Sequence, residues 1–339
     1  MKRVLKYYFK KRFFVVGVIS FIFLLITFIS LYNDKFIIER YYEFKTSIEA
    51  YNSPFGMLAL FAAIIGTIVV PLEFSFKMNK IKIDQLYSLP IKREKIFISK
   101  LIICIVETVI PLTLSFILSF LMVVFKENIF DLKYFIPYYF LLVFYSVVLI
   151  TTFAFIYTRA NRNGDGIVNM IAYAFLLLVI IEFTNEYFNL NKHLIESTDF
   201  LIYSPISIIN DEFDKLLCNI DSNFKTSEII SLILFPIIGG AFFYLFVKLN
   251  KEDKSEDCLE VSNSLFSYRL FLPIYGICLG SLVLELDSFS LYIFVIISLY
   301  IGYVIKNRNF KLNNNDFKWY ISLVIISFIL GVLGQNIFY

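Results

Sequence analysis

The sequence has few of the residues that metal sites and catalytic sites most often use. It contains a single histidine, His193, and its four cysteines include no pair at CxxC spacing. We therefore expect no His/Cys metal site. Its 12 glycines form no GxxxxGK[ST] sequence, so the chain lacks the phosphate-binding loop of a P-loop ATPase.

Charged residues are scarce as well. They make up 17% of the 339 residues, whereas 59% of the residues are hydrophobic. In soluble domains about a quarter of the residues are charged. The net charge of +3 is too small to indicate a nucleic-acid partner. This composition excludes an ordinary soluble domain and is typical of an integral membrane protein.

Long apolar runs are abundant. A helix needs about 20 apolar residues to cross a bilayer, and the sequence predicts nine spans, so we expect an all-α fold, a polytopic transmembrane helical bundle. The spans are residues 13–32, 55–74, 97–125, 135–158, 167–184, 229–247, 271–286, 289–305 and 319–337. The last apolar stretch before residue 306 is divided in two because Glu285 and Asp287 interrupt it. The first run is too long for the core of a signal peptide and is predicted to be retained.

The distribution of basic residues predicts the orientation. With the N-terminus in the cytoplasm, 23 of the 31 Lys and Arg fall in cytoplasmic segments and 8 in external ones, in agreement with the positive-inside rule. The loop 75–100 is then cytoplasmic, the acidic loop 185–228 is external, and the odd number of spans puts the C-terminus outside. Frequent Phe, Ile, Lys, Asn and Tyr indicate an AT-rich genome, so we expect a multi-pass protein of a bacterial plasma membrane.

The basic segment 1–12 precedes the first span. On a helix, its lysines share one face and its apolar residues lie mostly on another, which predicts an amphipathic helix at the membrane interface. A plain positive-inside anchor explains the same residues equally well. The sequence leaves both interpretations open.

The cytoplasmic loop 75–100 carries the most informative pattern. It contains a helix-compatible apolar patch with basic residues on both sides, formed by Ile81, Ile83, Leu86, Tyr87 and Leu89. Pro90 suits the first turn of a following helix. A short amphipathic segment held between two spans fits a groove on another protein. A loop that lies against the membrane is an equally good interpretation.

The residue order in this loop resembles the loop after the second span in membrane subunits of ABC-2 type exporters. The matching residues are Asp84, Leu86, Tyr87, Ser88, Leu89, Pro90, Ile91, Arg93 and Lys100. In that family the loop forms a coupling helix that docks into the partner ATPase, and a basic segment like 1–12 forms a connector helix. The sequence Ser204-Pro205-Ile206-Ser207 resembles the family's Ser-Pro element beyond the fifth span, where short helices form an outer gate.

This resemblance implies a permease subunit of an ATP-driven exporter. Residues 13–250 would form a six-span core, and residues 251–339 a C-terminal extension with about three further spans. The chain would be no enzyme and bind no cofactor itself, because ATP and Mg would bind a separate ABC ATPase subunit. A second permease subunit, identical or different, would complete the pathway. The alternatives are a carboxylate-based intramembrane enzyme and a non-catalytic membrane sensor or assembly protein.

Acidic residues at membrane depth are the remaining candidates. Glu73, Glu107 and Glu182 are candidates for the translocation path, because charges at that depth are costly and usually functional. Glu73 and Glu182 lie near span ends, where they could also simply reach the interface. Glu107 lies deeper, and three hypotheses account for it: protonation, pairing across a dimer interface, or a position along a water-filled path.

Overall fold

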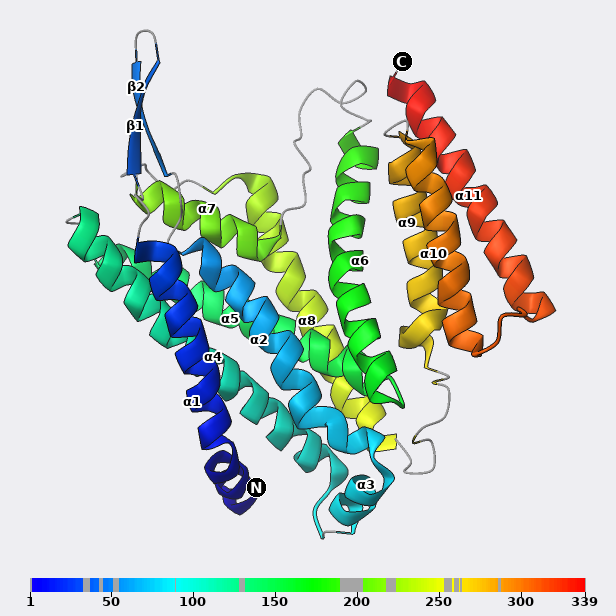
Figure 1. Cartoon of the computed structure of the whole chain (residues 1–339), viewed down its shortest axis with the longest axis horizontal. Coiled ribbons are helices and arrows are strands. Elements are labelled where there is room, and N and C mark those ends of the chain that lie inside the picture. The colour runs from blue at the N-terminus through cyan, green and yellow to red at the C-terminus, as the bar shows by residue number, and fades with distance from the viewer. Residues whose placement is uncertain are drawn as a thin grey trace. The chain divides into compact units, whose positions relative to one another are not determined.

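The computed structural model describes residues 2–32, 37–42, 45–50, 55–88, 90–127, 132–189, 204–217, 224–252, 258, 262, 264–285 and 288–338. Within these ranges the chain is almost entirely helical (Figure 1). The helices are α1 (Lys2–Tyr32), α2 (Gly56–Phe74), η1 (Ser75–Met78), α3 (Lys80–Tyr87), α4 (Arg93–Glu127), α5 (Leu132–Thr158), α6 (Asn163–Asn189), α7 (Pro205–Leu217), α8 (Thr226–Glu252), η3 (Leu265–Arg269), α9 (Leu270–Glu285), α10 (Phe289–Asn307) and α11 (Asn314–Phe338).

Nine helices in the described ranges are long and apolar enough to cross a membrane, which confirms the predicted polytopic helical bundle. The division of the apolar stretch near residue 286 is also confirmed, since α9 ends at Glu285 and α10 begins at Phe289. Many large apolar side chains on these helices are exposed, Phe14 by 78% for example. Such surfaces suit lipid rather than water.

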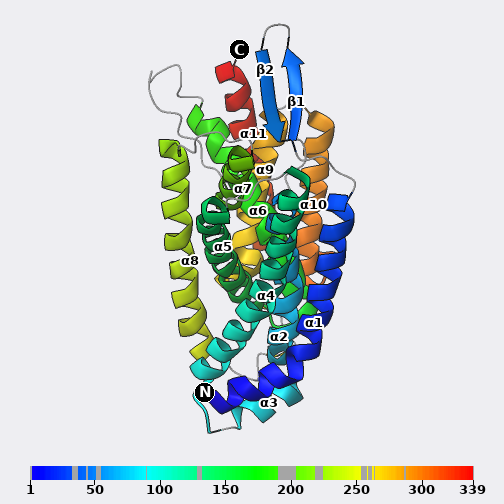
Figure 2. The same ribbon diagram turned by 90° about the vertical axis from the view of Figure 1, so that its left-hand side faces the viewer.

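The all-α prediction missed one element in the segment 33–54. Strands β1 (Ile37–Tyr42) and β2 (Lys45–Ala50) pair antiparallel, with Ile37 opposite Ala50, and project beyond the end of α1 (Figure 2). Two runs of six residues separated by two residues have the spacing of a β-hairpin. The strands contain β-branched and aromatic residues, which favour a sheet.

The N-terminal segment also differs from the prediction. Residues 2–12 do not form a separate helix but continue into the first span, so that α1 is one helix from Lys2 to Tyr32. The segment before residue 17 contains neither glycine nor proline, so nothing in its backbone favours a break.

Contacts divide the chain into two units. The first comprises Met1–Phe76, Asp84–Phe155 and Tyr203–Asp253, and the second comprises Lys77–Ile83, Ile156–Ile202 and Lys254–Tyr339. The fifth span, α6, therefore groups with the last three spans, whereas the sequence-based division placed it in the core. Its contacts explain the grouping: Asn169 of α6 donates a hydrogen bond to Ser267 at 3.2 Å, and the rings of Tyr173 and Phe271 are 5.9 Å apart.

In the first unit, α1, α2 and α4 pack side by side. At one end Lys126 of α4 donates hydrogen bonds to the carbonyl groups of Leu31 and Tyr32, the latter at 2.9 Å. These carbonyls belong to the last turn of α1, which has no partner within the helix. A cation at a helix C-terminus is also favourable for the helix dipole. Lys126 therefore fastens the end of α1 to α4.

Helix α7 lies across the ends of the spans in the first unit (Figure 1). It is fixed by a buried aromatic cluster that consists of Phe55, Phe116, Phe135 and Phe213. The rings of Phe213 on α7 and Phe55, just before α2, stack with centroids 4.5 Å apart. Helix α7 begins at Pro205, within the external loop 185–228 of the predicted topology.

In the second unit, α9, α10 and α11 pack closely through small residues. Gly276 and Gly280 of α9 form a GxxxG sequence, a spacing that permits close helix packing in membranes. A Cβ atom on Gly280 would lie 2.9 Å from the Cβ of Ser327 on α11. Tyr292 of α10 donates a hydrogen bond to the Val324 carbonyl of α11 at 2.8 Å, which connects α10 to α11.

Two neighbouring glycines in α8 provide a test of packing in the first unit. A Cβ atom on Gly239 would lie 2.5 Å from Val148 of α5, whereas one on Gly240 would meet nothing within 4 Å. Alanine increases helix propensity by up to about 1 kcal/mol at either position, but overpacking costs about 1–3 kcal/mol. Thermal unfolding in detergent should therefore show Gly240→Ala at or above the wild type and Gly239→Ala below it. Equal stabilities would show that the two helices pack less closely here.

Topology is testable by labelling of single cysteines in a cysteine-free background. Asn79 and Lys225 are both exposed, and the predicted orientation puts them on opposite sides of the membrane. A membrane-impermeant reagent added to intact cells should modify Lys225→Cys and leave Asn79→Cys unmodified. Ser288→Cys, between α9 and α10, should react like Lys225→Cys. The reverse pattern would invert the orientation.

Candidate functional site

Four charged side chains meet where α1, α2 and α4 approach one another in the first unit. Arg12 lies at the start of the first span, and Glu73 is the second-to-last residue of α2. Lys100 and Glu107 lie seven residues apart on α4, so both face the same side of that helix. We call these four residues the charged cluster.

Glu73 is the centre of this cluster. Its side chain is 0% exposed, and it accepts a hydrogen bond of 2.6 Å from the Lys100 ammonium. The Arg12 guanidinium pairs with the other carboxylate oxygen and also donates a hydrogen bond to the Leu72 carbonyl at 3.0 Å. A buried charge is tolerated when good ionic partners compensate its loss of hydration. Glu73 therefore joins three helices through ion pairs.

Glu107 has a different environment. It is 1% exposed, and neither of its carboxylate oxygens has a hydrogen-bond partner within the described part of the chain. Glu73, Arg12 and Lys100 are close enough to act on it electrostatically. Its burial within its own chain does not fit the hypothesis that it pairs across a dimer interface. A buried polar group without a partner is rare in native proteins and usually has a specific reason.

Buried aromatic rings surround the ends of the loop 75–100. Phe74 at the end of α2 lies 6.2 Å from Phe97 near the start of α4, and both rings contact Phe246 of α8, at 5.6 and 6.1 Å. The Lys100 ammonium lies 5.9 Å from the ring centroid of Phe76. The two ends of the loop are thus packed against each other and against α8.

Helix α3 lies between these fixed ends and confirms that the apolar part of the loop is helical. Its exposed residues are Lys80, Ile81, Lys82, Asp84 and Gln85, and Ser88 directly after the helix is exposed as well. Ile81 is 71% exposed, whereas Ile83 is buried and Leu86 and Tyr87 are half-buried. Leu89 lies outside the described residues. The predicted patch is therefore divided between two faces of α3, and Ile81 is its exposed member.

The expectation for Pro90 was wrong. α4 begins at Arg93, so Pro90 lies in the connection before the helix and not in its first turn. Proline disfavours helical conformation in the residue before it, and here it separates α3 from α4. The Arg93 guanidinium lies 4.4 Å from the ring centroid of Tyr87, and the hydroxyl of Ser88 donates to the Gln85 carbonyl at 2.8 Å.

The other predicted site residues lie elsewhere. Glu182 is exposed on α6 in the second unit. Pro205 is the first residue of α7, a position that proline favours. The Ser204 carbonyl before it accepts hydrogen bonds from the Ile208 amide at 3.1 Å and the Ser207 hydroxyl at 2.8 Å.

One buried ion pair on α7 was missed. Glu212 is 1% exposed; the ammonium of Lys215 lies 2.5 Å from one of its carboxylate oxygens, and the Tyr138 hydroxyl donates to the other at 3.3 Å. The hydrogen bond to Glu212 raises the pKa of Lys215 above its usual value. The spacing of three residues on a helix was the available signal. The ion pair lies within α7, and the hydrogen bond from Tyr138 connects Glu212 to α5.

The chain was compared with family models, curated proteins and solved structures. No family model, curated protein or solved structure matches the chain. The class of the protein therefore follows from its helices: nine apolar helices of spanning length in the described ranges are those of a multi-pass membrane protein. A more specific function has to be argued from the charged cluster and the loop beside it.

Proposed function

We propose that the chain is the transmembrane permease subunit of an ATP-driven exporter of the ABC-2 type. In this proposal residues 80–95 dock into a separate ATPase subunit that binds ATP and Mg. The observation that carries it is the geometry of the loop: α3 exposes Ile81 beside Asp84, while both ends of the loop are fixed by buried contacts. An exposed apolar side chain on a rigidly held short helix suits a groove on another protein.

The charged cluster gives this proposal a mechanical basis. Movement of α3 on its partner would act on the end of α2 and the start of α4, which flank the loop. Because Glu73 pairs with both Arg12 and Lys100, the ends of α1, α2 and α4 would move together. Packed elements of this kind transmit a shift as a unit. A second permease subunit, identical or different, would form the other side of the pathway, and Glu107 is our candidate for a residue along it.

The alternative function is an intramembrane enzyme that uses carboxylates. The buried carboxylate of Glu107, which lacks a hydrogen-bond partner among the described residues, is the observation that favours it. An enzyme of this kind would convert its substrate without a partner ATPase. Activity that persists in the purified chain alone and disappears in Glu107→Gln would favour this alternative over the exporter.

The exporter proposal is tested by site-specific crosslinking in the native host. A photo-crosslinking amino acid at Ile81 is expected to capture a polypeptide that contains a P-loop, since this side chain is exposed. The same amino acid at Ser207, exposed on α7, serves as the control and should capture no ATPase. The purified complex should hydrolyse ATP. Failure of Ile81 to capture an ATPase in the intact protein would refute the docking proposal.

A further inference from the structure

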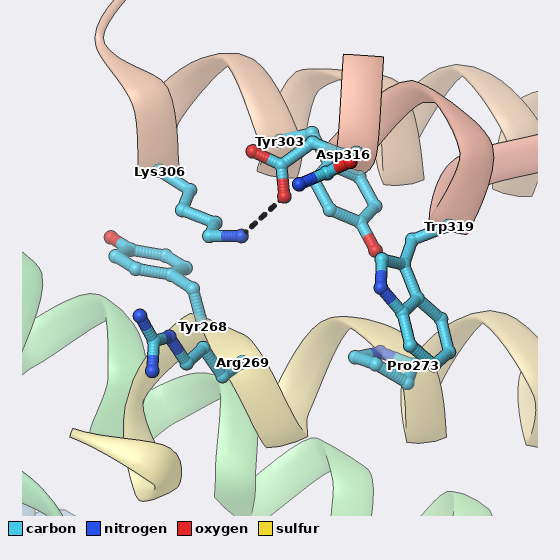
Figure 3. A pocket seen from close by; sticks show the side chains of 8 residues that line it. Tyr268, Arg269, Pro273, Tyr303, Lys306, Asp316 and Trp319 are labelled. Atoms are coloured by element: carbon cyan, nitrogen blue, oxygen red, sulfur yellow. Dashed lines mark hydrogen bonds and ion pairs between the residues drawn. The ribbon is translucent and has the colours of Figure 1, made fainter. Parts of the chain in front are cut away.

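The second unit contains a pocket that the proposed function does not use. It has a volume of about 330 Å³ and lies where α9 begins, α10 ends and α11 begins (Figure 3). Its lining includes Tyr268, Arg269, Tyr303, Lys306, Asp316 and Trp319. Each of these helices belongs to a candidate membrane span, and the pocket lies at the ends of all three. It is therefore placed at the depth where spans meet the lipid headgroups.

The charges of the pocket favour an anion. Its lining contains two cations, Arg269 and Lys306, and one acid, Asp316. The Lys306 ammonium lies 2.7 Å from one carboxylate oxygen of Asp316, and Asn307 donates to the other at 2.8 Å. Asp316 thus fixes Lys306 in place with both of its oxygens engaged. The formal charge of the lining remains positive.

Aromatic side chains form much of the remaining wall. Figure 3 shows Tyr268 and Arg269 facing Lys306 across the pocket, with Trp319 beside Pro273 at its other side. Trp319 is 61% exposed, and tryptophan prefers the boundary between headgroups and acyl chains. A small soluble anion would contact only the basic side chains of the pocket. An amphiphile would contact both the basic side chains and the apolar aromatic wall.

We propose that this pocket binds the phosphate group of an anionic phospholipid. Arg269 and Lys306 would hold the phosphate, and the indole of Trp319 would pack against the glycerol and the start of the acyl chains. Basic pockets between membrane helices bind acidic headgroups in this way. Soluble phosphate shares the charge but not the apolar part, so the experiment has to separate these two sources. The proposal does not depend on an ATPase partner.

Trp319 is the only tryptophan of the chain and therefore reports on the pocket directly. The full-length chain is reconstituted in two kinds of phosphatidylcholine vesicle. One kind contains phosphatidylglycerol with brominated acyl chains, and the other contains brominated phosphatidylcholine at the same mole fraction. Brominated phosphatidylglycerol should quench the fluorescence more strongly than brominated phosphatidylcholine. Arg269→Gln should reduce this preference about fivefold, as expected for one interfacial cation. Lys311→Gln, which removes an exposed charge that does not line the pocket, should retain it.

A second variant tests the pocket independently, in case Arg269→Gln fails to fold. The double change Lys306→Gln/Asp316→Asn removes the other cation without leaving an unpaired acid, and it should also lower the preference for phosphatidylglycerol. Equal quenching by the two brominated lipids in the wild type would overturn the proposal. If inorganic phosphate at constant ionic strength removes the extra quenching by brominated phosphatidylglycerol, the pocket binds soluble phosphate. That result would contradict the proposed phospholipid ligand.

Discussion

Replacement of Glu73 by glutamine is expected to lower the free energy of unfolding by about 3–5 kcal/mol, because it breaks buried ion pairs from one side only. Glutamine has nearly the same shape, so the loss would come from charge and not from packing. Lys100, itself 7% exposed in its side chain, would keep a charge with its anion removed, and Arg12 would lose the same partner. Thermal unfolding of the purified chain in detergent measures the effect.

Glu107→Gln is the matched control for this prediction. Both glutamates are 1% exposed, and both belong to the charged cluster, but Glu107 makes no hydrogen bond in the described structure. Its replacement therefore removes no hydrogen bond and should leave the stability near that of the wild type. Similar losses in the two variants would contradict the assignment of Glu73 as the centre of the ion pairs.

A double variant tests whether the stability lost in Glu73→Gln comes from the buried charge of Lys100. In Glu73→Gln/Lys100→Met the uncompensated buried cation is gone, and a side chain of similar length remains. Replacing a buried ion pair by apolar side chains is often nearly neutral, so the double variant should recover part of the stability that Glu73→Gln loses. Neighbouring sites of this kind are not expected to be additive.

The spans were predictable because their signal is local. A run of about 20 apolar residues identifies a membrane helix without any knowledge of its neighbours, and each predicted span has a counterpart in the structure. The interruption at Glu285 and Asp287 was likewise sufficient to divide α9 from α10. The helical part of the loop 75–100 was visible as a short amphipathic pattern.

The charged cluster was not predictable because its members are distant in sequence. Arg12 and Lys100 lie 61 and 27 residues from Glu73, measured along the chain. Hydropathy placed Arg12 just before the first predicted span and Lys100 within the first turn of the third, where the sequence-based analysis used both residues only as indicators of orientation. Tertiary packing decides which ends of α1, α2 and α4 meet, and a single sequence does not encode those contacts in a local pattern.

The exposed face of α3 required the structure for a similar reason. Spacing alone places Ile81 and Ile83 on different faces of a helix, but it does not show which face the protein covers. The structure buries Ile83 and exposes Ile81. Of the other members of the predicted apolar patch, Leu86 and Tyr87 are half-buried, and Leu89 lies outside the described residues.

Ile81→Asp is expected to abolish binding of the partner ATPase if α3 is the coupling helix. A charge at the centre of an apolar contact is left without hydration or a counterion, and a central contact residue contributes about 2 kcal/mol or more, roughly a thirtyfold loss of affinity. Leu86→Asp should also lose the partner, but its half-buried position means that it could disturb α3 as well. Arg93→Ala should keep most of the binding, because exposed charges contribute about 0–1 kcal/mol.

Asn79→Asp is the matched control for Ile81→Asp. It adds the same charge two residues earlier, and aspartate can still accept the hydrogen bond that the Asn79 side chain receives from the Lys82 amide at 3.2 Å. The measurement is co-purification with the ATPase and stimulated ATP hydrolysis at equal membrane abundance of each variant. Asn79→Asp and Arg93→Ala should resemble the wild type, while Ile81→Asp loses both signals. If Ile81→Asp binds and stimulates normally, α3 does not couple this chain to an ATPase.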